Sequence, residues 1–329
     1  MYLLEFAGED DHLAVAEAKV VTDGCHSVAP GIGLADTVAL EEADRLALTR
    51  RINRSLGVVE GTLDDLVSYV ESLAPDADGT VAVRARDVRG LGDVDTQTTE
   101  RRIGDVLVRH GHTVDLESPD REFRVLATTS QDRPRWFVGW LLLETPREYT
   151  HRAPPLRPFR QPGTMDPLLA RVLVNLTGVH PGDRLLDPMC GPGGVLIEAA
   201  LVGVEPIGID VQRKMVRGAR QNIEEIVDPT HPADIVQGTA AQLPIRAVDA
   251  IVFDAPYGRQ SPIEHTSANE LVEATLNEAI EVTDRCVAVF DAPLDELATA
   301  CGWSVVDTFE RRVHRSLTRY ISCLQSRDR

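Results

Sequence analysis

The stretch from Arg184 to Gly194, RLLDPMCGPGG, places an acidic residue and a cluster of glycines directly after a short apolar run. Leu185 and Leu186 predict the end of a buried strand, and the apolar sequence that follows predicts a helix. A strand, a glycine-rich turn and a helix form the nucleotide-binding half of a doubly wound sheet, and glycines let the backbone approach a ligand closely. The stretch therefore indicates a nucleotide-type ligand, although an ordinary glycine-rich turn without a ligand would show the same pattern.

The spacing of these glycines narrows the choice of ligand. It does not match the G-x-G-x-x-G fingerprint of dinucleotide sites, and no lysine followed by Ser or Thr is present, which excludes a phosphate-binding P-loop. An acid followed by G-x-G-G suits a cation-bearing ligand such as S-adenosylmethionine, which has an amino acid group and a sulfonium. The residues of this stretch that we expect in the cofactor pocket are Asp187, Pro188, Cys190, Gly191, Gly193 and Gly194.

Two further predicted strands end in residues that suit the same ligand. The strand EPIGID ends at Asp210, where a carboxylate can accept hydrogen bonds from ribose hydroxyls, and we place Val211 in the same pocket. The strand ADIVQG leads into Gly238, Thr239 and Ala240, which we expect to border the adenine.

The run Asp254-Ala255-Pro256-Tyr257-Gly258 follows the fourth predicted strand of this half and resembles the D-P-P-Y motif of methyltransferases that act on base amino groups. An exocyclic amine is a poor nucleophile because its lone pair is delocalised into the ring. A carboxylate and a backbone carbonyl that accept its two hydrogens turn the lone pair towards a methyl donor. The resemblance makes Asp254 the proton acceptor, the Ala255 carbonyl the second acceptor and Tyr257 a stacking platform for a flipped-out base. An ordinary strand-end turn is the alternative.

Two positions depart from the pattern of that family. Ala255 replaces the first proline of the motif; alanine keeps the backbone carbonyl, so we expect a looser turn and retained activity. Thr239 stands where relatives commonly carry Asp, so a contact to the adenine amine is missing or comes from another group.

The elements expected around this site alternate between strands and helices over residues 164–329. Asp166 followed by Pro167 predicts a helix start, and Gly178 predicts its end. Strand-helix alternation predicts a mainly parallel, doubly wound sheet, and the last two strand-like runs, around Trp303 and Tyr320, are expected to pair antiparallel. The predicted fold class is thus α/β, with a Rossmann-like domain.

The first half of the chain predicts a smaller α+β arrangement. Its expected elements are strands over 2–7 and 80–88, helices from Asp10 or Asp11 to about Asp23 and over 41–55, 63–73 and 96–110, and three strand-like runs between 112 and 145. The runs V-R-x-R, R-R-I-G-D-V-L, V-D-L-x-x-P-D and F-V-G resemble a THUMP domain, an RNA-binding module of tRNA-modifying enzymes. The resemblance covers residues 51–145, and residues 1–50 are similar to the ferredoxin-like extension that precedes this module. It implies a tRNA substrate but not the chemistry.

The middle of the chain is its only segment that is not acidic. Residues 84–160 hold 14 arginines against 12 acidic residues, whereas the segments on both sides are strongly acidic. A proline- and arginine-rich stretch, residues 146–163, predicts a semi-rigid linker. Solvated charges and local scatter remain the alternatives to a polyanion-binding role. The arginines that we expect to contact RNA are Arg84, Arg86, Arg89, Arg152, Arg157 and Arg160.

Taken together, the THUMP-like half, the linker R-x-P-x-x-R-P-F, D-P-M-C-G-P-G-G and D-A-P-Y-G-R are similar to archaeal tRNA guanine-N2 methyltransferases that modify the guanosine at position ten. This resemblance implies transfer of one or two methyl groups from S-adenosylmethionine to the exocyclic amine. Two alternatives stay open: a methyltransferase for another base or amino group, including adenine and cytosine in DNA or RNA, and a non-catalytic tRNA-binding THUMP protein.

Composition limits the remaining possibilities. The net charge of -18 with only two lysines resembles proteins of halophilic archaea, although a GC-rich genome also replaces Lys by Arg. Five scattered cysteines without a C-x-x-C pair argue against a metal site and for a reducing cytoplasm. Neither a membrane span nor a signal peptide is expected. Whether the chain acts as a monomer or with a partner subunit is left open.

Overall fold

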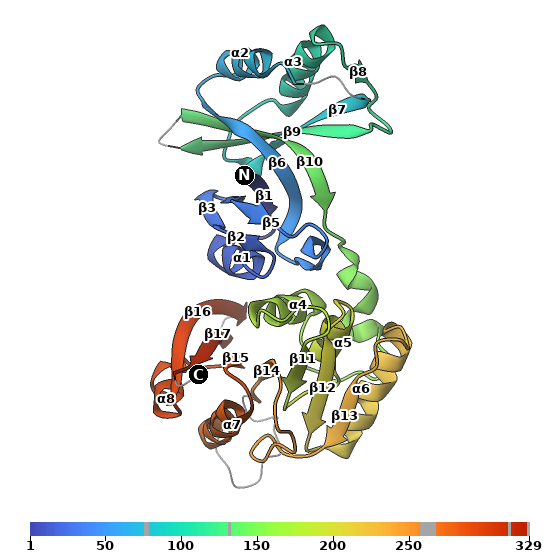
Figure 1. Ribbon diagram of the computed structural model, residues 1–329, viewed down its shortest axis with the longest axis vertical. Helices are drawn as coiled ribbons and strands as arrows, with labels where there is room; N and C mark the ends of the chain where they lie inside the picture. The colour runs from blue at the N-terminus through green and yellow to red at the C-terminus, as the bar shows by residue number, and fades with distance from the viewer. Residues whose placement is uncertain (76–78, 131–132, 257–267, 315–316, 328–329) are drawn as a thin grey trace. The chain divides into compact units, whose positions relative to one another are not determined.

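The computed structural model describes residues 1–75, 79–130, 133–256, 268–314 and 317–327 (Figure 1). The chain divides into two compact units, Met1–Pro146 and Arg147–Arg329. Tyr257 of the predicted motif lies outside the described residues, so its role stays a prediction.

The first unit is built on one eight-stranded sheet, in the order β3-β4-β1-β6-β10-β9-β7-β8. Strand β7 pairs parallel with β8 and β9, and the other neighbours pair antiparallel. The short strands β2 (Thr22–Asp23) and β5 (Thr37–Val38) pair separately. The strands of the large sheet are β1 (Tyr2–Phe6), β3 (His26–Ala29), β4 (Ile32–Ala35), β6 (Thr49–Glu60), β7 (Thr80–Asp87), β8 (Thr113–Val114), β9 (Arg121–Ser130) and β10 (Arg133–Glu144).

Two helices, α2 (Leu63–Leu73) and α3 (Thr96–Arg109), cover one face of this sheet (Figure 1). Their buried leucine, isoleucine and valine side chains pack against Phe123, Trp136 and their neighbours in a single hydrophobic cluster. Thr62 and Asp65 form a capping box at the start of α2, which confirms the predicted bounds of this helix. The remaining helices of the unit are α1 (Asp11–Ala18), η1 (Ala43–Arg45) and η2 (Val88–Gly90).

The helix predicted over residues 41–55 is wrong. The structure forms only the short η1 there and then the twelve-residue strand β6, which pairs with β1 on one side and β10 on the other. Pairing on both edges satisfies every backbone group of a central strand, and this gain outweighs a local helical periodicity. The boundary expected at residue 50 therefore falls inside a strand, and one sheet continues through it.

The second unit is a doubly wound sheet in the order β13-β12-β11-β14-β15-β17-β16. The first five strands in this order pair parallel, and β17 pairs antiparallel with β15 and with β16. This confirms the predicted fold class, including the antiparallel pair at the end. The strands are β11 (Arg184–Asp187), β12 (Glu205–Asp210), β13 (Asp234–Gln237), β14 (Ala250–Asp254), β15 (Arg285–Phe290), β16 (Trp303–His314) and β17 (Leu317–Ser326).

Helices and apolar clusters cover the strands of this unit. Helices α5 (Gly194–Ala200) and α6 (Arg213–Ile226) supply one cluster, and α7 (Ala268–Val282) and α8 (Asp295–Ala300) supply another. The predicted start of α4 (Pro167–Leu176) is confirmed, since the Asp166 carboxylate accepts the N–H of Leu168 at 2.9 Å. Within the described residues, no helix is both long and apolar enough to cross a membrane.

Candidate active site

The site lies where the strand order of the second unit reverses. The chain runs outward from β11 through β12 to β13, and it restarts at β14 on the other side of β11. In open α/β sheets, ligands bind at the carboxyl ends of the strands at such a switch point. Asp187 ends β11, Asp254 ends β14, and Asp210 ends the neighbouring strand β12. The fold thus brings the three acids expected from the sequence to one edge of the sheet.

Backbone contacts fix the glycine turn between β11 and α5. The N–H of Cys190 donates to the Ile209 carbonyl at 2.9 Å, and the N–H of Gly193 donates to the Cys190 carbonyl at 2.9 Å. Gly193 has a φ of +81° and Gly191 a φ of +50°, a region that favours glycine. At Gly191 no heavy atom lies within 4 Å of the position that a Cβ would take. The turn therefore leaves room beside its backbone, as a ligand-binding turn requires.

Asp187 is an acid whose negative charge is disfavoured by its surroundings. Its side chain is buried, and its Oδ1 accepts the N–H of Met189 at 3.0 Å. Burial raises the pKa of Asp187 to about 8, the Met189 hydrogen bond lowers it, and the carboxylates of Asp210 and Asp254 raise it further. A cationic ligand beside Asp187 would offset this cost, which fits the amino group of S-adenosylmethionine.

Asp210 joins β12 to the glycine turn. Its Oδ2 accepts the N–H of Gly191 at 3.0 Å, and its Oδ1 accepts the N–H of Gln212 at 2.7 Å. Burial raises the pKa of Asp210, while these two hydrogen bonds lower it. A carboxylate has about four acceptor sites, so hydroxyl groups can still bind it. Asp210 therefore supports the turn in addition to the ribose-binding role that the sequence predicts.

The positions expected near the adenine follow β12 and β13. Val211 is 64% exposed, so its apolar side chain is available to contact an adenine ring. The N–H of Gly238 donates to the Asp210 carbonyl at 3.1 Å, which ties the end of β13 to that of β12. Thr239 is exposed and its hydroxyl accepts the N–H of Ala241 at 3.3 Å, whereas Ala240 is buried. These residues meet at the same sheet edge as Asp210.

Asp254 has two carboxylate oxygens with different surroundings. Its Oδ2 accepts from Nη1 of Arg319 at 3.0 Å. Its Oδ1 is buried and has no hydrogen-bond partner among the described residues. Burial raises the pKa of Asp254 to about 6, and Arg319 lowers it through charge and hydrogen bonding. Ala255 is held beside it, because its N–H donates to the Val289 carbonyl at 2.9 Å. One oxygen is thus fixed, and the other is available as an acceptor.

Several residues that shape this site were missed at the sequence level. Arg319 comes from the distant strand β17. The buried side chain of Asn222 accepts from the N–H of Phe159 at 2.8 Å and donates to the Pro192 carbonyl at 2.9 Å, so it clamps the glycine turn. Gly208 lets α5 and the glycine turn pack on β12, since a Cβ there would lie 2.5 Å from Leu196 and 3.0 Å from Cys190. No local sequence signal marks these three positions, because their partners are distant along the chain.

Two of the arginines in residues 146–163 that we expected to contact RNA, Arg152 and Arg157, are largely buried. Arg152 pairs with Glu198, which is fully buried and also accepts from Arg171 at 2.9 Å. Arg157 is 1% exposed and donates to the Arg152 carbonyl at 2.9 Å. These side chains pack within the second unit, together with η3 (Glu148–Arg152) and η4 (Pro154–Leu156). The expected phosphate contacts of Arg152 and Arg157 do not fit this burial; Arg160 is exposed.

The arginines expected to bind RNA in the first unit also have partners. Arg84 donates to the Leu116 carbonyl at 2.7 Å, and Arg86 approaches Glu5 at 3.5 Å. Arg89 pairs with Asp11, which offsets its charge. Among the residues that the structure describes, no group of three or more His, Cys, Asp or Glu side chains could hold a metal ion.

A doubly wound sheet of this strand order, with a glycine turn after β11 and acids ending β11, β12 and β14, defines a class I methyltransferase. A family model of the RMKL-like methyltransferase domain matches residues 154–321. The chain is 35% identical over 297 residues to the tRNA (guanine(10)-N2)-dimethyltransferase of Methanothermobacter thermautotrophicus, covering 85% of this chain and 83% of the relative. It belongs to the archaeal tRNA guanine-N2 methyltransferase family, and its cofactor is S-adenosylmethionine.

Further comparisons agree with this assignment. The tRNA (guanine(10)-N2)-dimethyltransferase of Pyrococcus abyssi is 30% identical over 341 residues, covering 99% of this chain and 100% of the relative. The crystal structure of TrmN from Thermus thermophilus aligns with 99% of this chain and 100% of its own, with a TM-score of 0.53 and 22% identity. At that identity the structural similarity shows a shared fold.

Proposed function

We propose that this chain transfers one or two methyl groups from S-adenosylmethionine to the N2 amine of guanosine 10 in tRNA. The observation that carries the proposal is Asp254, with Oδ2 held by Arg319 at 3.0 Å and Oδ1 without a partner among the described residues. A buried acceptor of this kind at a switch point suits an amine that must be oriented. Relatives named as guanine(10)-N2 dimethyltransferases support the nucleotide and the number of methyl groups.

The residues at the ends of β11, β12 and β13 fit the cofactor. Asp187 is a buried carboxylate that gains from a positive neighbour, Asp210 can accept from ribose hydroxyls, and Val211 offers an exposed apolar surface. The open space at Gly191 allows backbone contact. The cofactor supplies an electrophilic methyl group, and these residues bind and orient it.

The protein's part in the transfer rests on Asp254 and Ala255. In the ionised form, Oδ1 of Asp254 accepts one hydrogen of the guanine amine, and the carbonyl of Ala255 accepts the other. The amine lone pair then points away from the ring and towards the methyl group. As the nitrogen gains the methyl it loses a proton, which Asp254 takes up. Arg319 keeps the carboxylate ionised and holds its second oxygen in place.

The rest of the assignment follows from the resemblances of the chain. Tyr257 would stack on the flipped base, and residues 51–145 would act as the THUMP module that binds tRNA. The acidic, lysine-poor composition fits a protein that works in the cytoplasm of a halophilic archaeon. Ala255 keeps the backbone acceptor of the motif, and its N–H bond to Val289 holds the turn without the first proline.

Mass spectrometry of nucleosides from an unmodified tRNA transcript, incubated with the protein and S-adenosylmethionine, tests this function. We expect N2-methylguanosine or N2,N2-dimethylguanosine, and no product from a transcript in which guanosine 10 is replaced by adenosine. A methylated adenine or cytosine, or a product that persists in the substituted transcript, would contradict the proposal. A catalytically silent protein that still binds tRNA would favour the non-catalytic alternative.

A further inference from the structure

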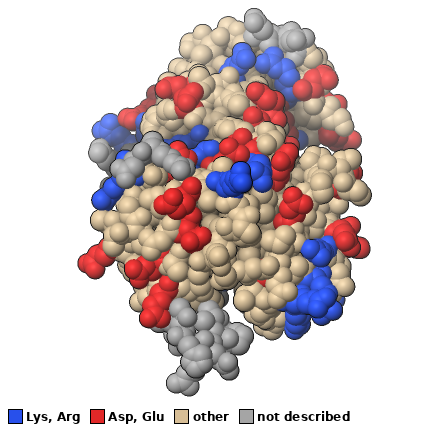
Figure 2. Space-filling model, turned by 60° about the horizontal axis from the view of Figure 1, so that its bottom comes forward, with Lys and Arg blue, Asp and Glu red and all other residues tan. Residues whose placement is uncertain are grey.

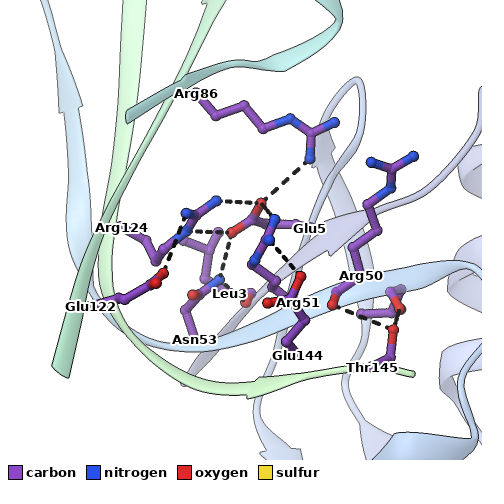
Figure 3. A network of polar contacts seen from close by, with 11 residues as sticks. Leu3, Glu5, Arg50, Arg51, Asn53, Arg86, Glu122, Arg124, Glu144 and Thr145 are labelled. Atoms are coloured by element: carbon purple, nitrogen blue, oxygen red, sulfur yellow. Dashed lines mark hydrogen bonds and ion pairs between the residues drawn. The ribbon is translucent and has the colours of Figure 1, made fainter. Parts of the chain in front are cut away.

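Three arginines surround the buried carboxylate of Glu5 in the first unit (Figure 3). Glu5 of β1 is 1% exposed, and Arg124 of β9 donates to both of its oxygens at 3.0 Å. Arg86 of β7 approaches the same carboxylate at 3.5 Å, and Arg51 of β6 approaches it at 3.9 Å. We call Glu5, Arg50, Arg51, Arg86 and Arg124 the Glu5 cluster. It lies on the sheet face opposite α2 and α3, because Arg124 alternates with residues that pack under those helices.

A β-bulge brings Arg50 into this cluster. Glu5 pairs with Arg51 and Phe6 pairs with Thr49, so Arg50 is the extra residue between the two pairs. A bulge changes the direction of a side chain that would otherwise point to the opposite face. The buried Thr145 fixes the bulge: its N–H donates to the Arg50 carbonyl at 2.9 Å. In Figure 3 the guanidinium groups of Arg50 and Arg86 extend into the same space.

Glu5 does not fully neutralise the positive charges of Arg50 and Arg86. Arg124 takes both oxygens of Glu5, and Arg51 has a second partner in Glu144. The guanidinium of Arg50 is exposed and has no hydrogen-bond or ion-pair partner among the described residues. Burial lowers the pKa of Arg86, Glu5 raises it, and nearby Arg50 and Arg51 lower it. Arg50 and Arg86 therefore lie near each other, and the carboxylate beside them, Glu5, is already bound by Arg124.

We propose that Arg50 and Arg86 form a binding site for a backbone phosphate of the RNA substrate, with Glu5 and Thr145 as the positioning residues. A phosphate between the two guanidinium groups relieves their repulsion and accepts paired N–H donors, the geometry that arginine offers. The inference rests on the proposed function, because it takes an RNA as the ligand. It adds Arg50, which lies within the acidic segment before residue 84, to the expected set and gives a role to the position of Arg86.

Preorganised contacts matter for this protein because the chain as a whole is acidic and repels RNA. With a net charge of -18, long-range attraction cannot draw in a polyanion. On the face that Figure 2 shows, acidic side chains are spread among several separate groups of basic ones, and no continuous basic patch forms. Preorganised phosphate contacts can offset this long-range repulsion. The Glu5 cluster provides such a contact, since Glu5 holds the Arg86 side chain and Thr145 holds the backbone of Arg50 before the ligand arrives.

The test is the binding of a tRNA transcript by the full chain, measured by fluorescence anisotropy over a range of KCl concentrations. The double variant Arg50→Gln/Arg86→Gln keeps Glu5 paired with Arg124, so we expect it to fold. Its affinity should fall about tenfold, and the slope of log K against log [KCl] should decrease by roughly 0.7–0.9, the value for one lost phosphate contact. Melting temperature and S-adenosylmethionine affinity report on folding.

The matched control is Arg54→Gln, which removes one charge from the same strand. Arg54 is exposed and, three residues beyond Arg51 on β6, points to the opposite face of the sheet. We expect little change in affinity or slope for this variant. An unchanged salt slope in the double variant, or an equal loss with Arg54→Gln, would overturn the inference. Nucleoside analysis of the wild-type reaction is independent of these slopes, so a failure of the proposed function would show itself separately.

Discussion

Arg319 and Asp254 are 65 positions apart in the chain, yet Nη1 of Arg319 lies 3.0 Å from Oδ2 of Asp254. The two side chains come from β17 and β14, with β15 between these strands in the sheet. Both are largely withdrawn from water, with 7% of the arginine side chain and 23% of the aspartate side chain exposed. The pair therefore links the antiparallel end of the sheet to the residue on which the proposed transfer depends.

The first prediction concerns the pH dependence set by this pair. Asp254 acts in its ionised form and its pKa is about 6, so methyl transfer should fall as the pH drops through that value. Arg319→Gln removes the cation that lowers this pKa, so the acidic limb of the single-turnover rate should move to higher pH, while tRNA affinity stays similar. Arg319→Lys should restore part of the shift. A rate that decreases equally at every pH would indicate a purely structural role for Arg319.

Substitution of Asp254 itself separates orientation from charge. Asp254→Ala should lower the single-turnover rate on pre-bound tRNA by orders of magnitude, because orientation and proton acceptance are lost together, while the cofactor still binds. Asp254→Asn keeps an acceptor oxygen but is a far weaker base and carries no charge. Substantial activity in the Asn variant would show that orientation dominates, whereas an Ala-like rate would show that charge does. Near-wild-type turnover in the Ala variant would contradict the role of this residue.

Asp210→Ala should weaken S-adenosylmethionine binding by roughly 1–3 kcal/mol, because hydroxyl partners lose a charged acceptor. Since Asp210 also accepts the N–H of Gly191, the variant should lose some stability of the turn as well. Titration calorimetry measures the affinity. Asp234→Ala is a matched control, as it removes an exposed carboxylate from the start of β13, and it should leave the affinity unchanged. Equal affinities for both variants would reject the assignment.

Substitution of Asp187 should have opposite effects on stability at higher pH and on cofactor binding. Its folded-state pKa of about 8 lies above that of an unfolded aspartate, so the folded form binds the proton more tightly. The stability that this group contributes is present at low pH and is lost as the pH rises from about 4 towards 8. Asp187→Asn should remove this loss, so the free energy of unfolding of the cofactor-free protein should fall less over this range. The same variant should bind S-adenosylmethionine more weakly, because the cationic amino group loses its partner.

Urea unfolding between pH 4 and 8, compared with calorimetry at pH 8, distinguishes these two effects of Asp187→Asn. A variant that binds the cofactor as tightly as the wild type would show that Asp187 serves only the turn, through its hydrogen bond to Met189.

Glu198 should be important for folding although it is not expected to touch the substrate. Its buried carboxylate accepts from Arg152 and Arg171, so Glu198→Gln removes the negative charge that these two arginines share. Loss of one partner of a buried ion pair typically costs about 3–5 kcal/mol, and urea unfolding should show a decrease of this order. The exposed Glu224→Gln on α6 is the control and should change stability little. A similar small effect for Glu198→Gln would contradict its structural role.

The sequence by itself predicted that three candidate acids end strands of one sheet. Asp187, Asp210 and Asp254 each end a short apolar strand, and the ends of parallel strands fall at one sheet edge whatever the details of packing. The same local logic fixed the start of α4 at Pro167 and the bounds of α2. Patterns of this kind depend on neighbours within a few residues, so they can be interpreted without the fold.

The tertiary structure alone decided which arginines serve the site and which serve the fold. Arg319 reaches Asp254 because β17 inserts antiparallel next to β15, and Arg124 reaches Glu5 over 119 positions because β1 and β9 share a sheet. Residues 49–55 became part of strand β6 for the same reason, since pairing with β1 and β10 outweighed local periodicity. Strand order sets these contacts, and strand order depends on the burial of the whole sheet, which no local pattern encodes.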